Sequence, residues 1–263
     1  MADNKKILFL DILTDNRHLR KIINKKIYRG STYSEAMRKA FGLPKTAWVF
    51  ADAAEGKFPK DFSRFDALVM GGSTEDPMRG FEKPWMMETY KFIRRAVKKN
   101  IPILGICGGF QFVLRALGGE IILNPKGREF GSVTIAFLPA GRRDPLFYGF
   151  GRGAIFQSSH KCMMKKNLPG WKLLASSDLC RYQALAIGKN IRLIQFHPEM
   201  KAAYIRALAR MRKKNLLGEG FVKNNVEFVK FLSSVKNTET AGKRILKNFL
   251  KYFVKFDRIQ PVC

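Results

Sequence analysis

The segment Gly105-Ile106-Cys107-Gly108-Gly109 has the residue pattern best suited to chemistry. A cysteine occupies the serine position of a G-x-S-x-G nucleophile elbow, between a predicted strand and a predicted helix. This turn would place the Cys107 sulfur at the carboxyl edge of a sheet and at a helix N-terminus, where the helix dipole favours the thiolate. The backbone N–H of Gly108 would point to where an oxyanion forms. A buried cysteine in a glycine-rich turn is the alternative.

A thiol nucleophile needs a base, and the chain has three histidines. His197 follows the apolar run 191–196, which predicts a strand, and Glu199 follows two residues later in Gln-Phe-His-Pro-Glu. If this strand runs parallel to the one before Cys107, both side chains reach the same edge of the sheet. Glu199 would then accept a hydrogen bond from the imidazole and orient it. The spacing predicts a Cys107–His197–Glu199 triad, with a surface turn as the alternative for His-Pro-Glu; His18 is predicted to lie on the surface.

The elements that must position these residues alternate between short apolar runs and helical patterns, which is typical of a parallel sheet covered by helices. Strands are predicted at residues 7–13, 47–51, 66–70, 101–106, 132–137, 154–158, 171–175, 183–187 and 191–196. Helices are predicted at 32–42, 85–99, 108–117, 202–214, 221–235 and 242–256. The sequence therefore predicts an α/β fold. No linker divides it, so we expect one domain over residues 1–263, with a core at 7–200 and a helical extension at 201–263.

Positive charge dominates the composition: 49 Lys and Arg face 21 Asp and Glu, a formal net charge of +28. Segments 14–45 and 201–263 are both basic, and this charge favours anionic partners such as nucleic acid or an anionic surface. The final predicted helix places its apolar residues on one face, so the simpler interpretation is packing on the core with solvated lysines. The four cysteines lack disulfide-framework or zinc-site spacing. No apolar run is long enough for a membrane helix, and we expect a soluble cytoplasmic protein without a metal.

Several segments together carry a resemblance to a known family. They are Asp66–Ser73, Pro102–Gln111, Ala116–Glu120, Lys126–Gly131, Ser158–His160 with Leu168–Gly170, and Gln195–Glu199. This set resembles the class I glutamine amidotransferases of the triad type, over about residues 7 to 200. The resemblance implies a flavodoxin-like, three-layer fold with a central, mostly parallel sheet and helices on both faces. The run Asp144-Pro145-Leu146-Phe147 is most similar to the stand-alone, GMP-synthase-like glutaminase domains.

The resemblance implies a role for each matching residue. Cys107 would attack the side-chain amide of glutamine, His197 would carry the proton, and Glu199 would orient His197. The N–H groups of Gly72 and Gly108 would form the oxyanion hole. Substrate contacts are implied for Gln111, Ser158, Ser159 and His160, although a structural role fits His160 equally well. No cofactor is implied.

Three functions follow from these observations. The first is glutamine hydrolysis to glutamate and ammonia through a thioester, with the ammonia passing to an unknown acceptor such as a separate synthetase subunit. The sequence contains no G-x-x-x-x-G-K-[ST] phosphate loop that would bind ATP. The second is a γ-glutamyl hydrolase that uses the same triad. The third is a non-catalytic, basic binding protein that retains the fold.

Overall fold

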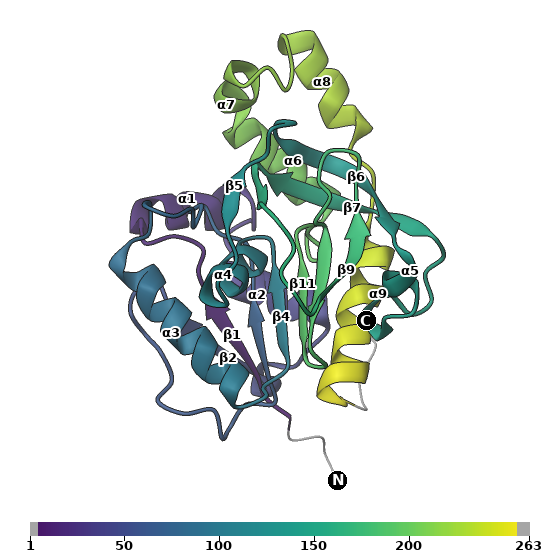
Figure 1. The fold of residues 1–263 in the computed structure, drawn as a ribbon. Coiled ribbons are helices and arrows are strands. Elements are labelled where there is room, and N and C mark those ends of the chain that lie inside the picture. The colour runs from purple at the N-terminus through teal and green to yellow at the C-terminus, as the bar shows by residue number, and fades with distance from the viewer. Residues whose placement is uncertain (1–4, 257–263) are drawn as a thin grey trace.

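The computed structural model describes residues 5–256 of the chain. A nine-stranded sheet forms the centre of this part (Figure 1). In spatial order its strands are β2 (Trp48–Asp52), β1 (Ile7–Asp11), β3 (Ala67–Met70), β4 (Ile103–Ile106), β11 (Ile191–Ile194), β10 (Ala184–Ile187), β9 (Trp171–Ser176), β6 (Glu129–Phe137) and β7 (Gly153–His160). The first five are parallel, and the last four continue the sheet in antiparallel pairs. β5 (Ile121–Leu123) and β8 (Cys162–Met164) form a separate antiparallel pair.

This architecture confirms the predicted α/β fold, and the sheet is mixed. Each predicted strand is present, with its ends shifted by at most a few residues. Every residue of β1, β3, β4 and β11 is buried, including Asp11 and Arg192, as expected for parallel strands covered on both faces. The sequence reasoning missed β5 and β8, because three residues are too few to show a period.

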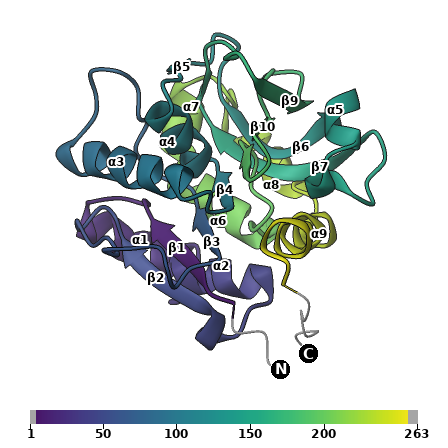
Figure 2. The ribbon, with the colours of Figure 1, turned by 60° about the horizontal axis from the view of Figure 1, so that its bottom comes forward.

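Helices cover both faces of the parallel half of the sheet (Figure 2). The helices of the described residues are α1 (Arg17–Lys26), α2 (Tyr33–Phe41), α3 (Pro84–Lys98), α4 (Gly108–Ala116), α5 (Pro139–Arg142), α6 (Ala202–Met211), α7 (Lys213–Gly218), α8 (Asn225–Ser234) and α9 (Glu239–Phe249), of which α5 packs on the antiparallel strands β6 and β9. Short 3₁₀ turns occur at Lys45–Ala47 and Pro145–Phe147, and a π-helical turn follows α9 at Leu250–Val254. No helix within residues 5–256 has both the length and the apolar character needed to cross a membrane.

Strand alternation divides the core into two layers. In β1, Ile7 and Phe9 face the layer that contains α1, α2, α6 and α9. Leu8 and Leu10 face the opposite layer, which contains α3 and α4. Successive side chains of a strand point to opposite faces, so one five-residue strand contributes to both layers.

Helix α2 has clear start and stop signals. The Thr32 side chain accepts a hydrogen bond from the backbone N–H of Glu35 at 3.1 Å, which caps the first turn. Gly42 ends the helix in the left-handed conformation at φ 69°. These two caps fix where Tyr33, the first residue of α2, enters the interior.

The C-terminal extension packs against the sheet. Ile245, Leu246 and Phe249 of α9 are fully buried, which supports the packing interpretation of this helix. α9 also lies close to the segment after β11, since a Cβ atom at Gly242 would collide with the carbonyl oxygen of Pro198. The extension thus supports the chain immediately after His197.

Candidate active site

Cys107 occupies a strained turn between β4 and α4. Its backbone has φ 52° and ψ −101°, a region that costs a residue with a side chain about 1–3 kcal/mol. Its N–H donates a hydrogen bond to the carbonyl oxygen of Ile194, the last residue of β11, at 2.8 Å. The surrounding structure therefore holds the sulfur at the carboxyl ends of two adjacent parallel strands.

The glycines after Cys107 allow α4 to begin directly against β3 and the loop that follows it. A Cβ atom at Gly108 would lie 2.5 Å from the nitrogen of Ser73, and one at Gly109 would lie 2.5 Å from the oxygen of Met70. Neither approach is possible for a residue with a side chain unless the backbone moves. The Gly108 N–H belongs to the first turn of α4, where N–H groups have no partner within the helix.

His197 and Glu199 lie at the same edge as Cys107. The His197 Nδ1 atom is 2.8 Å from Glu199 Oε1, and both side chains are buried. The backbone N–H of His197 donates to the carbonyl oxygen of Gln157 at 2.7 Å, which joins this segment to β7. Cys107 and His197 line the same small cavity. The structure thus brings together the three residues of the predicted triad.

His197 is electrostatically coupled to its two neighbours. Burial alone would lower the pKa of the imidazole. The negative charges of Cys107 and Glu199, with hydrogen bonds to both, outweigh burial and raise the pKa of His197 to about 10. With this pKa, the imidazolium is the form of His197 present at neutral pH.

Tyr33 is a residue of this site that the sequence reasoning missed. Its hydroxyl accepts a hydrogen bond from the Gly72 N–H at 2.6 Å and donates one to Glu199 Oε1 at 3.2 Å. The predicted oxyanion donor Gly72 therefore already has a partner in this structure. No sequence signal pointed to Tyr33, because a capping pattern predicts where a helix starts and not what its first side chain touches.

Three of the four predicted substrate residues line a cavity beside Cys107, and the fourth, Ser158, lies behind its wall. A cavity of about 190 Å³ beside Cys107 is lined by Gln111, Ser159 and His160, together with charged residues. The carbonyl oxygen of Ser159 lies 3.9 Å from the Cys107 sulfur. The Ser158 side chain instead donates to the carboxylate of Glu129 at 3.2 Å, so it supports the cavity wall.

Glu129 is a buried anchor behind this wall. His160 Nε2 lies 3.0 Å from Glu129 Oε2, and its Nδ1 lies 3.0 Å from the carbonyl oxygen of Cys162. The side chains of Ser177 and Gln183 also donate to the Glu129 carboxylate. Both ring nitrogens of His160 are thus occupied, which fits a structural role for this histidine.

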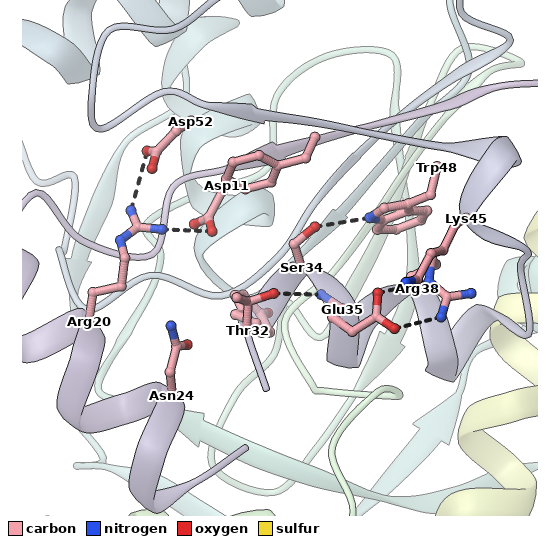
Figure 3. Close-up of a pocket in the computed structure, with 12 residues that line it drawn as sticks. Asp11, Arg20, Asn24, Thr32, Ser34, Glu35, Arg38, Lys45, Trp48 and Asp52 are labelled. Carbon is pink, nitrogen blue, oxygen red and sulfur yellow. Dashed lines mark hydrogen bonds and ion pairs between the residues drawn. The ribbon is translucent and has the colours of Figure 1, made fainter. Parts of the chain in front are cut away.

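A second cavity, of about 370 Å³, lies between α1, α2 and the strands β1 and β2 (Figure 3). Arg20 extends across it and binds Asp11 at 2.8 Å and Asp52 at 3.3 Å. Arg38 likewise pairs with Glu35 at 2.6 Å. These two cations of the basic segment 14–45 are therefore balanced by carboxylates, whereas His18 is exposed as predicted.

The Tyr33 hydroxyl provides a stability test. We expect Tyr33→Phe to lower the free energy of unfolding by about 1–3 kcal/mol, because it leaves the Gly72 N–H without its partner and removes one of the two hydrogen bonds to Glu199 Oε1. Urea denaturation measures this change. Tyr28→Phe is the matched control: Tyr28 stacks on Tyr33 at 5.2 Å and is also buried, but its hydroxyl forms no hydrogen bond within residues 5–256. Equal effects of the two substitutions would contradict the proposed network.

Comparisons with known proteins identify relatives of this chain. The model of the family "Glutamine amidotransferase class-I" matches residues 44–206, more than half of the chain. The chain is 28% identical over 262 residues to gamma-glutamyl peptidase 4 of Arabidopsis thaliana, covering 95% of this chain and 97% of the relative. It is 29% identical over 180 residues to a glutamine-hydrolyzing GMP synthase subunit of Sulfolobus acidocaldarius, covering 66% and 88% respectively. A glutamine amidotransferase from Thermotoga maritima shares the fold, with a TM-score of 0.70 at 17% identity over 97% of this chain and all of that one. The chain therefore belongs to the class I glutamine amidotransferase family.

Proposed function

We propose that this protein hydrolyses γ-glutamyl amides through a thioester on Cys107, with glutamine as the simplest substrate. The proposal is supported by the arrangement of three buried side chains. Cys107 and His197 line one small cavity, Glu199 is hydrogen-bonded to His197, and a cavity with polar and charged walls adjoins Cys107. A nucleophile, a proton carrier and an orienting acid in this order are the parts that acyl transfer requires.

The proposed reaction begins when the Cys107 thiolate attacks the γ-carbonyl carbon. The carbonyl π electrons move to the oxygen, and the Gly108 N–H binds this oxyanion. The Gly72 N–H is the second donor once it exchanges its Tyr33 partner for the oxyanion. His197 gives its proton to the leaving nitrogen as the C–N bond breaks, which leaves a glutamyl thioester. His197 then takes a proton from water, the resulting hydroxide attacks the thioester, and glutamate leaves as the thiolate re-forms.

A γ-glutamyl peptide is the second candidate substrate. The relative that matches this chain over nearly its whole length is a gamma-glutamyl peptidase by name, and its similarity extends over both terminal segments. In addition, the small cavity shared by Cys107 and His197, of about 50 Å³, has apolar side chains on one wall, including Ile23 of α1, Ile27 directly after α1, and Leu208 of α6, with Arg212 also in its lining. An apolar cavity on the side of the proton donor suits a leaving group larger than ammonia.

If glutamine is the substrate, a separate partner protein is expected to use the ammonia. The GMP synthase relative is named as one subunit of its enzyme, so it works within a larger assembly. If this chain releases ammonia from glutamine, we propose that a separate synthetase subunit consumes it. A γ-glutamyl peptidase would need no such partner.

Glutamate release from purified protein tests the proposal and separates its two forms. We expect hydrolysis of glutamine, of a γ-glutamyl dipeptide, or of both, and a loss of at least about 1,000-fold in kcat/KM in Cys107→Ala, because the nucleophile is gone. Cys180→Ala is the matched control, since burial raises the pKa of this thiol to about 12 and it lines neither cavity beside Cys107. No release from either substrate, or equal release by Cys107→Ala, would refute the proposal.

The pH profile tests the role of His197. Its pKa is raised to about 10, so it keeps the proton for the leaving group up to that pH. We therefore expect kcat/KM on the alkaline side to stay level past pH 7 and to fall only as the pH rises through about 10. The measurement is glutamate release over a pH series. An alkaline decline near the ordinary histidine pKa of about 6.5 would contradict this role.

A further inference from the structure

Arg212 is a cation of the reaction cavity that has no assigned role. It follows directly after α6 and lines both cavities that contain Cys107. Its Nη1 atom donates one hydrogen bond, to the Ser159 hydroxyl at 3.0 Å. Ser159 is also the residue whose carbonyl oxygen lies 3.9 Å from the Cys107 sulfur. Ser159 thus contacts both the Arg212 guanidinium and the Cys107 sulfur.

Arg212 has no ion-pair partner among the described residues. The other two cations of the 190 Å³ cavity are paired, since Arg128 binds Glu219 at 2.7 Å and Lys161 binds Asp76 at 3.2 Å. No carboxylate within residues 5–256 lies at ion-pair distance from Arg212. Burial, and then the charge of Arg128, lower the pKa of Arg212, while the charges of Cys107, Asp76 and Glu219 act in the opposite direction. Arg212 is half-buried, and a half-buried charge without an ion-pair partner costs free energy that an incoming anion would recover.

We propose that Arg212 binds the α-carboxylate of the γ-glutamyl group and thereby selects γ-glutamyl substrates over other amides. This assignment rests on the proposed function, because it places the γ-carbonyl at Cys107 and the carboxylate at the other end of the same side chain. A guanidinium offers two parallel N–H groups that match the two oxygens of a carboxylate. Arg212 also lies beyond the residues 44–206 that match the family model, so the C-terminal extension supplies this specificity.

The test compares glutamine with 4-aminobutanamide, which lacks only the α-carboxylate. We expect Arg212→Gln to raise the KM for glutamine by about 10- to 100-fold, the usual effect of losing a charge-assisted pair. The kcat/KM for 4-aminobutanamide should not change, so the preference for glutamine disappears. Arg212→Lys, which keeps the charge without the planar fork, should restore part of the preference. Arg210→Gln is the matched control, because Arg210 is exposed in the last turn of α6, two residues before Arg212.

A second readout does not depend on turnover. A diazoketone analogue of glutamine should alkylate Cys107 saturably in the wild type. Arg212→Gln should raise its half-saturating concentration by the same about 10- to 100-fold and leave the rate with neutral iodoacetamide unchanged.

The outcomes separate the two claims. Suppose that the wild type hydrolyses γ-glutamyl amides. If Arg212→Gln then leaves the KM for glutamine and the half-saturating concentration of the analogue unchanged, or slows the reactions of both substrates and of iodoacetamide equally, the carboxylate assignment is wrong. The proposed function stands in both cases. The first result would show that Arg212 does not bind substrate, and the second that it acts on the Cys107 thiolate or on folding. If the wild type neither hydrolyses these amides nor is labelled saturably by the analogue, the proposed function fails and the Arg212 assignment fails with it.

Discussion

A carboxylate buried behind an imidazole is the constraint on which the rest of this structure depends. Glu199 Oε1 receives hydrogen bonds from His197 and Tyr33, while its Oε2 atom is buried without a partner among the described residues. An ionised carboxylate in such a place costs several kcal/mol unless nearby groups compensate. The imidazolium of His197 provides that compensation. The fold therefore holds Glu199 against His197, and His197 lines the same small cavity as Cys107.

Helices from both ends of the chain pack around this site. α2 contributes Tyr33, which connects Glu199 to the Gly72 loop. α9 approaches the backbone at Pro198, where only a glycine at position 242 fits. On the other side of Cys107, the Glu129 network fixes the end of β7. Segments outside residues 44–206 thus contact the same site as the sequence motifs, and the similarity to a gamma-glutamyl peptidase covers 95% of the chain.

Local patterns predicted the part of the site that parallel strands bring together. β4 and β11 are adjacent and parallel, so the residues that follow them, Cys107 and His197, had to meet at one edge. Tyr33 and Arg212 could not be found in this way. Tyr33 reaches Glu199 across 166 positions, and its local sequence predicts only the start of a helix. The predicted helix 202–214 divides at Arg212, which has φ −97° and ψ 11°, and no proline or glycine marks this break. The side-chain direction of Arg212 therefore depends on a turn that helical periodicity does not reveal.

Trapping the covalent intermediate tests the central claim most directly. The protein would be mixed with glutamine or a γ-glutamyl dipeptide, quenched in acid within the first turnovers, and digested for mass spectrometry. The account predicts a glutamyl adduct on the peptide that contains Cys107, labile to hydroxylamine as a thioester is, and absent from the peptides that contain Cys162 and Cys180. Turnover of either substrate without an adduct at Cys107 at any quench time, or with the adduct on another residue, would contradict it.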